Sequence, residues 1–266
     1  MSHLRIACSA SCVFVLSALA GALSCGTARV DGPSRPMLAG WIAAGRAAEI
    51  PQSVLDDIRD RVRVFYGRTG HGEQITSGLA ILEAEDADRW APPEIEEHGG
   101  DLGSNGSTDW ADVTREFLSR EENEDVNVVM WSWCGGVTDN TPAGIRAYLE
   151  AMAELERDFP DVTFVYMTGH LDGTGLEGDL WEHNDMIREW CREHRRVLLD
   201  FADVDAYDPD GVLHADDDDS CNWCGDWCED NECPACDACP YTNCLNCRRK
   251  ALDFWWILAG VVGWSP

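Results

Sequence analysis

Apolar stretches of strand length alternate with amphipathic stretches of helix length through the middle of the chain. The run VNVVMWSW at 126–133 is continuously apolar, as a strand buried on both faces requires. Further strands are predicted at 62–66, 162–168 and 196–204. Helices are predicted at 51–62, 107–120, 141–159 and 179–194.

The helix predicted at 141–159 shows the pattern most clearly. Thr141 is a good cap, and Pro142 suits the first helical position. Strands that alternate with such helices predict right-handed crossovers and an α/β fold with a doubly wound, mostly parallel sheet of flavodoxin-like type. In such sheets ligands bind beyond the carboxyl ends of the strands.

The other segments are assigned from composition. Residues 26–50 lack a clear period and are predicted to be a leader or tether before an α/β domain at 51–215. Residues 83–109 are acidic and rich in Gly, Pro and Ser, which predicts a long surface excursion with one short strand near Asp101 and Leu102. Residues 216–266 are predicted to form a cysteine-rich appendage and a helix packed on the domain. Its inward side chains are predicted to be Phe254, Trp255 and Leu258.

Residues 1–25 have the pattern of an export signal. Arg5 precedes an apolar run at 6–23, which small residues follow. The stretch Ala22-Leu23-Ser24-Cys25 resembles a lipoprotein cleavage box, so Cys25 is the candidate for lipidation. Ordinary signal cleavage and an uncleaved membrane anchor are the alternatives. Each places the body outside the cytoplasm, as a secreted or membrane-anchored protein.

The charge of the chain limits its partners. The sequence has 49 acidic and 20 basic residues and a formal net charge of -29. Such a field repels phosphate backbones, which excludes nucleic acid as a partner. The sequence specifies no oligomeric state.

A dense cysteine cluster lies near the C-terminal end. In a cytosolic protein its short spacings would indicate two zinc sites, whereas behind an export signal disulfides are favoured. Two more cysteines, Cys134 and Cys191, are candidates to pair with each other or to join the cluster. The connectivity stays open. The cluster consists of Cys221, Cys224, Cys228, Cys233, Cys236, Cys239, Cys244 and Cys247.

Loops after the first two long strands carry candidate site residues. The turn GRTGHG offers Thr69 and His71 for catalysis, and its glycines Gly67 and Gly70 allow a ligand to approach the backbone. The loop CGGVTDN offers backbone N–H groups and a side-chain amide to an oxyanion, although the same residues also suit a helix start. The candidates in this second loop are Gly135, Gly136 and Asn140.

Loops after the later strands add acid and imidazole groups. His170 and Asp172 follow the strand at 162–168, where a capped turn is the alternative explanation. Asp210 lies close enough in sequence to orient His214 as a base, although Pro209-Asp210-Gly211 also suits an ordinary turn. The four aspartates at 216–219 lack the spacing of a calcium loop and are predicted to be a solvated run. Neither a metal nor a cofactor is predicted. Asn184 is a further candidate for substrate binding.

The order of these motifs resembles the SGNH/GDSL hydrolase superfamily, and in particular a group of exported, cysteine-rich bacterial proteins of SGNH type. The resemblance implies a serine ester hydrolase in which a turn serine attacks, a histidine near the C-terminus is the base, and Gly and Asn groups hold the oxyanion. The stretches that carry it are FYGRTGHGEQITSGL, VVMWSWCGGVTDN, VYMTGHLDGTG, VLLDFADVDAYDPDG, CNWCGDWC and FWWILAGVVGW.

The chain departs from that superfamily at decisive positions. Gly70 stands where the related turns have serine, and Arg68 stands where they have histidine. Three residues separate Asp210 from His214, whereas the superfamily usually has two. We therefore expect an extracytoplasmic hydrolase, of esterase or carbohydrate deacetylase type, that lacks the serine nucleophile and takes a small-molecule ester or carbohydrate. The alternative is a non-catalytic, disulfide-stapled surface or carbohydrate-binding protein.

Overall fold

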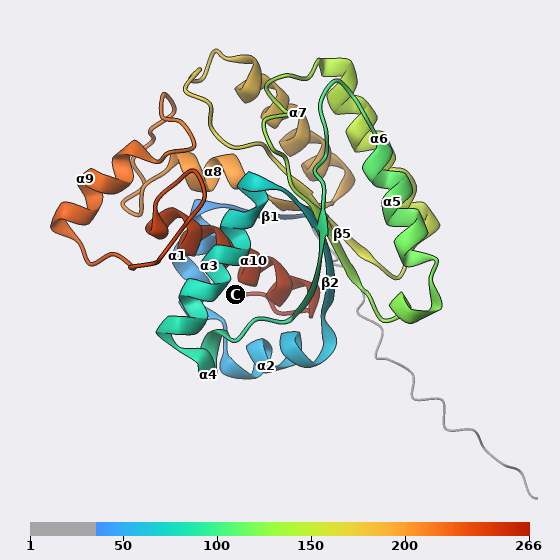
Figure 1. Ribbon diagram of the computed structural model, residues 1–266, viewed down its shortest axis with the longest axis horizontal. Coiled ribbons are helices and arrows are strands. Elements are labelled where there is room, and N and C mark those ends of the chain that lie inside the picture. Colours follow the sequence, from blue (N-terminus) through green and yellow to red (C-terminus); the bar gives the residue numbers. More distant parts are fainter. Residues whose placement is uncertain (1–35) are drawn as a thin grey trace, which may run out of the picture.

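The computed structural model describes residues 36–266, so the predicted export signal at 1–25 and Cys25 lie outside the described residues. The described residues form an α/β fold around one sheet of six parallel strands in the order β1-β6-β5-β4-β2-β3 (Figure 1). This confirms the predicted parallel α/β architecture. The strands are β1 (Met37–Ala39), β2 (Arg63–Arg68), β3 (Glu94–Gly99), β4 (Val128–Trp131), β5 (Thr163–Met167) and β6 (Val197–Leu199).

Helices cover both faces of the sheet, which is why its central strands are apolar throughout. All four residues of β4 are buried, as the continuous apolar run predicts. One face is covered by α5 (Asp109–Leu118), α6 (Pro142–Asp158) and α7 (Asp179–His194) (Figure 1). The other carries α1 (Trp41–Arg46), α2 (Gln52–Arg61), α3 (Glu73–Glu85) and α10 (Cys244–Val261). Short helices α4 (Ala87–Trp90), α8 (Phe201–Ala206) and α9 (Asn222–Asp230) lie between these elements.

The helix α10 lies at the centre of its face, against α3, α1 and the strands β1 and β6. Phe254, Trp255 and Leu258, the side chains expected to point inward, are all buried. At the crossing with α3, a Cβ atom on Gly78 would lie 1.9 Å from the carbonyl oxygen of Cys247. The two backbones touch there because Gly78 has no side chain.

The structure corrects the predictions for two segments. Residues 37–50 are not a tether, because β1 pairs in parallel with β6 and α1 packs against α10. Residues 83–109 contain α4 and the edge strand β3. The side chains of β3 are mostly exposed, which hides the strand from a hydrophobicity pattern. No strand forms at Asp101 and Leu102, although the buried Leu102 donates its backbone N–H to the Ser132 carbonyl at 3.0 Å.

The cysteine cluster forms four disulfides, which settles the choice between disulfides and zinc thiolates. The pairs are Cys221–Cys224, Cys228–Cys233, Cys236–Cys244 and Cys239–Cys247. Cys134 and Cys191 remain free thiols, so their predicted disulfide is wrong. Cys191 is buried within α7 while Cys134 is exposed. Disulfides in this number indicate a protein that works outside the cytoplasm.

Among residues 36–266, no helix combines the length and the apolar character that a bilayer span requires.

Candidate functional site

The strand order creates a crevice at one edge of the sheet. After β2 the chain moves outward to the edge strand β3, and after β4 it moves the other way to β5. The connections therefore diverge between β2 and β4, and ligands of open parallel sheets bind outside the carboxyl ends of the strands at such a point. The loop after β2 begins at Thr69 and the loop after β4 begins at Ser132.

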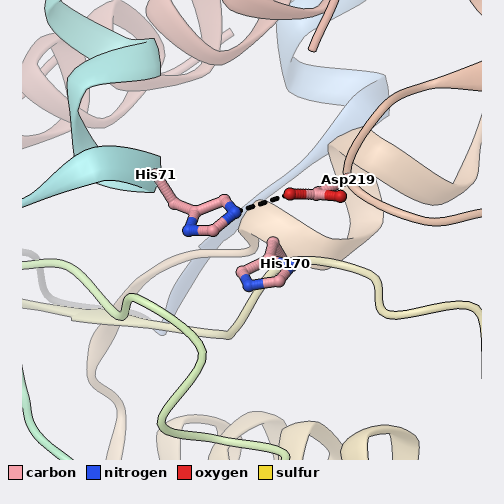
Figure 2. Close-up of side chains that lie close together, drawn as sticks. All are labelled: His71, His170 and Asp219. Atoms are coloured by element: carbon pink, nitrogen blue, oxygen red, sulfur yellow. Dashed lines mark hydrogen bonds and ion pairs between the residues drawn. The ribbon is translucent and has the colours of Figure 1, made fainter. Parts of the chain in front are cut away.

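Three side chains from distant parts of the chain meet at this edge. His71 follows β2, His170 follows β5, and Asp219 comes from the cysteine-rich segment (Figure 2). His71 Nε2 lies 2.6 Å from an oxygen of the Asp219 carboxylate. The two imidazole rings are stacked, with centroids 3.7 Å apart and planes 11° from parallel. One nitrogen or oxygen atom from each residue lies within 4.8 Å of the other two.

Local structure fixes both members of the hydrogen-bonded pair. His71 lies in the 3₁₀ turn Gly70–Gly72, directly before α3. The Glu73 N–H closes this turn on the Thr69 carbonyl, and the buried Tyr66 hydroxyl donates to the Gly72 carbonyl at 2.9 Å. On the other side, the Cys221 N–H bonds the Asp218 carbonyl, so the turn that carries Asp219 is joined to the Cys221–Cys224 disulfide.

Hydrogen bonding determines the tautomers of the two histidines. A carboxylate only accepts, so His71 donates its Nε2–H to Asp219 and its Nδ1 carries the lone pair. That Nδ1 is buried and has no hydrogen-bond partner within residues 36–266. His170 Nδ1 lies 2.7 Å from the Leu171 carbonyl, which also only accepts. His170 therefore keeps its proton on Nδ1 and a lone pair on Nε2.

Burial keeps His71 in the neutral form. Desolvation lowers the pKa of His71 below its ordinary value, the neighbouring His170 lowers it further, and the contact with Asp219 opposes both effects. A stacked pair of imidazoles also resists double protonation, because two positive charges would then lie face to face. His71 therefore favours its neutral form, with its Nε2 beside an oxygen of Asp219.

Tyr241 covers the second face of His71. Its ring stacks on His71 with centroids 4.7 Å apart, and since two rings cannot occupy one face, His71 lies between Tyr241 and His170. Tyr241 lies between Cys239 and Cys244, which belong to two different disulfides, and 61% of its surface is exposed. A Cβ atom on Gly70 would lie 2.7 Å from the Tyr241 ring.

A series of hydrogen-bonded, buried polar side chains links the Tyr241 loop to the core. Lys250 of α10 is fully buried, forms an ion pair with Asp205 at 2.5 Å and donates to the Gln74 side chain. Gln74 in turn donates to the Pro240 carbonyl at 2.8 Å, directly before Tyr241. Burial lowers the pKa of Lys250 to about 8 against the opposing charge of Asp205. Helix α10 thereby positions the Tyr241 loop.

The remaining residues of the predicted nucleophile turn have structural partners. The Thr69 hydroxyl donates to Asp101 at 3.2 Å and the structure gives it no bond to His71 or His214. A Cβ atom on Gly67 would lie 2.0 Å from the Trp131 ring, so Gly67 admits that tryptophan rather than a substrate. The predictions of Thr69 as a nucleophile and Gly67 as a substrate contact are therefore not supported by the geometry.

The predicted oxyanion groups after β4 serve the turn itself. Asn140 donates its amide to the Gly136 carbonyl at 2.9 Å, which closes the loop before α6. A Cβ atom on Gly136 would lie 2.2 Å from the Gly103 carbonyl oxygen, so Gly136 admits a neighbouring loop. Gly135 has a φ of +81°, a left-handed conformation that favours glycine. The turn requires these residue types without a ligand.

Asn184 and Asp172 also have structural roles. The buried Asn184 amide accepts from the Gly169 N–H at 2.8 Å and donates to the carbonyl of the same residue, so its prediction as a substrate contact is wrong. Asp172 accepts from the Thr138 hydroxyl at 2.7 Å and from Thr174. Burial alone would raise the pKa of Asp172, but these hydrogen bonds hold it below its ordinary value. Both residues shape the loop that carries His170.

The predicted acid and base near the C-terminal end do not pair with each other. His214 Nε2 lies 3.0 Å from Asp208, while Asp210 accepts from the Trp227 indole at 3.1 Å. Asp208 holds the turn by accepting the N–H groups of Asp210 and Val212, and this turn points Asp208 at His214. The pair lies in a separate cleft of about 570 Å³ whose lining includes four aspartates, Asp208 among them, and Trp223. The short sequence distance between Asp210 and His214 therefore predicted the wrong carboxylate as the partner of His214.

Asp219 and Tyr241 are site residues that the sequence did not indicate. Asp219 is the last of four consecutive aspartates and lies 148 positions from His71, so no spacing marks it. The prediction that the whole aspartate run is merely solvated is wrong for Asp219. Tyr241 gave no signal beyond its position among cysteines. Only the disulfide connectivity could have suggested that this segment folds back over the turn after β2.

A larger cleft lies elsewhere on the surface. It has a volume of about 1100 Å³ and lies among α1, α3, α10 and the cysteine-rich segment. None of His71, His170 and Asp219 lines it. Its lining includes Trp41, Trp90, Trp227, Leu245 and Leu252.

No protein-family model and no curated protein matches the chain. The described part of the chain is therefore defined by its own fold: an α/β protein with an all-parallel six-stranded sheet and a disulfide-bonded segment that reaches over the carboxyl edge of that sheet.

Proposed function

We propose that this protein is an extracytoplasmic hydrolase of ester or acyl-carbohydrate substrates, the activity that its resemblance to SGNH/GDSL hydrolases implies. The observation that carries the proposal is the His71, His170 and Asp219 cluster at the point where the connections of the sheet diverge. An imidazole with a free lone pair, stacked on a second imidazole that an aspartate holds, is suited to moving a proton during acyl transfer.

The nucleophile of this proposal is water. Gly70 supplies no hydroxyl, Thr69 donates to Asp101, and the fully buried Ser132 donates to the Gly67 carbonyl at 3.5 Å. His170 Nε2 carries a free lone pair, so it is the atom that accepts the proton as water attacks the acyl carbon. The stacked His71, held by Asp219, orients this ring. The water oxygen forms the new bond to the acyl carbon and the bond from that carbon to the ester oxygen breaks. His170 Nε2 returns the proton to this oxygen, which leaves as the alcohol.

Hydrolysis of 4-nitrophenyl acetate and of acetylated oligosaccharides by the purified chain tests the proposal. We expect turnover by the parent and a loss of about 10²- to 10⁴-fold in kcat for His170→Ala, the range that general base catalysis contributes. His214→Ala is the matched control, because His214 is also held by an aspartate but lies in another cleft. An inactive parent, or equal losses in both variants, would contradict the proposal.

The second candidate function is carbohydrate binding without catalysis. The observation that favours it is the cleft of about 1100 Å³ whose lining includes Trp41, Trp90 and Trp227, since indole rings stack on sugar rings. Titration with oligosaccharides, followed by tryptophan fluorescence, tests this function. Binding that Trp227→Ala abolishes, together with no turnover of any acyl substrate, would favour it over the hydrolase.

We propose in addition that the chain is anchored through Cys25, in line with the lipoprotein-like stretch before it. An expressed full chain should then partition into detergent, and Cys25→Ser should release it into the aqueous phase. Equal partitioning of both forms would exclude this anchor.

A further inference from the structure

We infer that His71, His170 and Asp219 bind one divalent transition-metal cation of the zinc class. Within residues 36–266 they are the one group of three or more His, Cys, Asp or Glu side chains whose ligand atoms converge. The inference goes beyond the proposed function, because cation binding is measured without a substrate.

The donor set and its dimensions fit such a cation. Bonds of about 2.1 Å in a tetrahedral arrangement separate two ligand atoms by about 3.4 Å. One atom from each residue already lies within 4.8 Å of the others, and His71 Nε2 lies 2.6 Å from the Asp219 oxygen. Small side-chain rotations therefore bring all three to bonding distance. Imidazole nitrogens favour zinc, copper or nickel over calcium and magnesium, which prefer oxygen ligands.

The surrounding contacts resemble the outer shell of a metal site. His170 donates its Nδ1–H to the Leu171 carbonyl, and this bond leaves Nε2 free as a ligand. His71 donates its Nε2–H to Asp219, so a cation that binds at Nε2 requires this proton to move to Nδ1 of the same ring. The neutral imidazole then binds through Nε2, and its number of protons does not change.

One histidine must turn for both lone pairs to point at the same cation. The two rings are stacked almost parallel, and their lone pairs lie in parallel planes. His71 is held between His170 and Tyr241, whereas His170 is the more exposed ring and has room to turn. A reorientation of His170 on binding is thus part of the inference.

Three protein ligands leave a position for water. Zinc sites with three protein ligands and an open position are typical of catalytic rather than structural zinc. With the cation bound, both histidine nitrogens are ligands, and the cation instead of a free imidazole acidifies the water.

The test is calorimetric titration of the chelator-treated full chain with ZnCl₂, in a Cys134→Ser background that removes the exposed free thiol. We expect one equivalent of zinc to bind. His71→Ala, His170→Ala and Asp219→Asn should each weaken binding at least tenfold. Cobalt(II) in place of zinc should give visible absorption typical of a tetrahedral site.

Two matched variants serve as controls. His214→Ala removes a histidine paired with Asp208 in another cleft, and Asp218→Asn removes the neighbouring carboxylate, which bonds Ser220. Both should bind zinc as the parent does. Circular dichroism and thermal melting show whether each variant is folded, and Asp219→Asn changes the shape of its side chain least.

The outcomes separate this inference from the proposed hydrolase. No zinc binding, binding that survives His170→Ala, or equal displacement by calcium would overturn the cation site. Ester hydrolysis at full rate by a chain that binds no zinc would overturn the cation site and leave the hydrolase intact. Zinc binding without any hydrolysis would leave the cation site intact and remove the hydrolase.

Discussion

At the scale of single residues, the Tyr241 ring limits the space for a side chain at Gly70. The φ of Gly70 is not in the left-handed region, so space alone excludes a side chain there. We predict that Gly70→Ala lowers the free energy of unfolding by about 1 to 3 kcal/mol, the usual cost of overpacking. Chemical denaturation measures the change.

A double-mutant cycle checks the cause of that loss. Tyr241→Ala removes the ring that a Cβ atom on Gly70 would meet at 2.7 Å. Gly70→Ala should therefore cost much less in the Tyr241→Ala background than in the parent. Costs that simply add would show that the contact with Tyr241 is not responsible.

The sequence predicted the two histidines of the site but not the carboxylate. His71 and His170 each follow a strand of a parallel sheet, so the topology alone brings both to one edge. Asp219 reaches that edge through a disulfide-bonded segment without a strand, and its path depends on pairings that spacing does not reveal. The short sequence distance predicts Asp210 as the partner of His214. The turn instead brings Asp208 to His214, and it therefore determines the pair.

At the scale of elements, α3 and α10 cross with their backbones in contact. A methyl group at Gly78 would meet the Cys247 carbonyl at 1.9 Å, and neither backbone can yield without moving its helix. We predict that Gly78→Ala lowers the free energy of unfolding by about 3 kcal/mol or more. Thermal and urea unfolding both report the loss.

Gly225 of α9 is the matched control for Gly78. It is also helical, but a Cβ atom there meets nothing within 4 Å. Gly225→Ala should raise stability by about 0.5 to 1 kcal/mol, because alanine loses less entropy in a helix than glycine. Equal effects at the two positions would contradict the crossing as the cause.

The disulfides differ in their distance from the site. Cys236–Cys244 and Cys239–Cys247 enclose Pro240 and Tyr241, whereas Cys228–Cys233 lies in the segment that lines the large cleft. We predict that Cys239→Ser/Cys247→Ser weakens zinc binding and hydrolysis, because the loop over His71 is released. Cys228→Ser/Cys233→Ser should leave both unchanged. The reverse order would show that Tyr241 does not organise the site.

The elements that the sequence predicted well are those with long apolar patterns. The strand β4 is buried along its whole length, and α6 has both a cap and a periodic apolar face. The strand β1 has three residues and β3 is an exposed, glutamate-rich edge, so neither gives a pattern of its own. Their pairing partners, not their own residues, make them strands.

At the scale of the whole molecule, acidic side chains lie in the interior as well as on the surface. Asp253 of α10 is fully buried, and neither carboxylate oxygen has a hydrogen-bond partner within the described residues. Burial raises the pKa of Asp253 well above its ordinary value, Asp200 and Asp203 raise it further, and Arg249 opposes them. The folded protein therefore holds this proton to a higher pH than the unfolded chain does.

This retained proton gives a predicted dependence of stability on pH. Above about pH 4 the unfolded chain loses the proton that folded Asp253 keeps, so stability falls as pH rises, by at most about 1.4 kcal/mol per unit. Asp253→Asn removes that fall. The variant should thus gain stability relative to the parent between pH 4 and pH 7, measured by urea unfolding at each pH. Parallel curves would show that Asp253 is ionised in the folded state.

The position of α10 also has a consequence for how the protein is made. Synthesis delivers every strand of the sheet before residues 244–261, yet that helix lies at the centre of one face of the sheet. Until it arrives, the nascent chain exposes apolar strands that favour aggregation, and the loop over His71 cannot close. A chain interrupted before Cys244 should therefore aggregate rather than fold as a smaller domain. Completion of the chain, closure of the disulfides Cys236–Cys244 and Cys239–Cys247, and assembly of the site are for this protein a single late event.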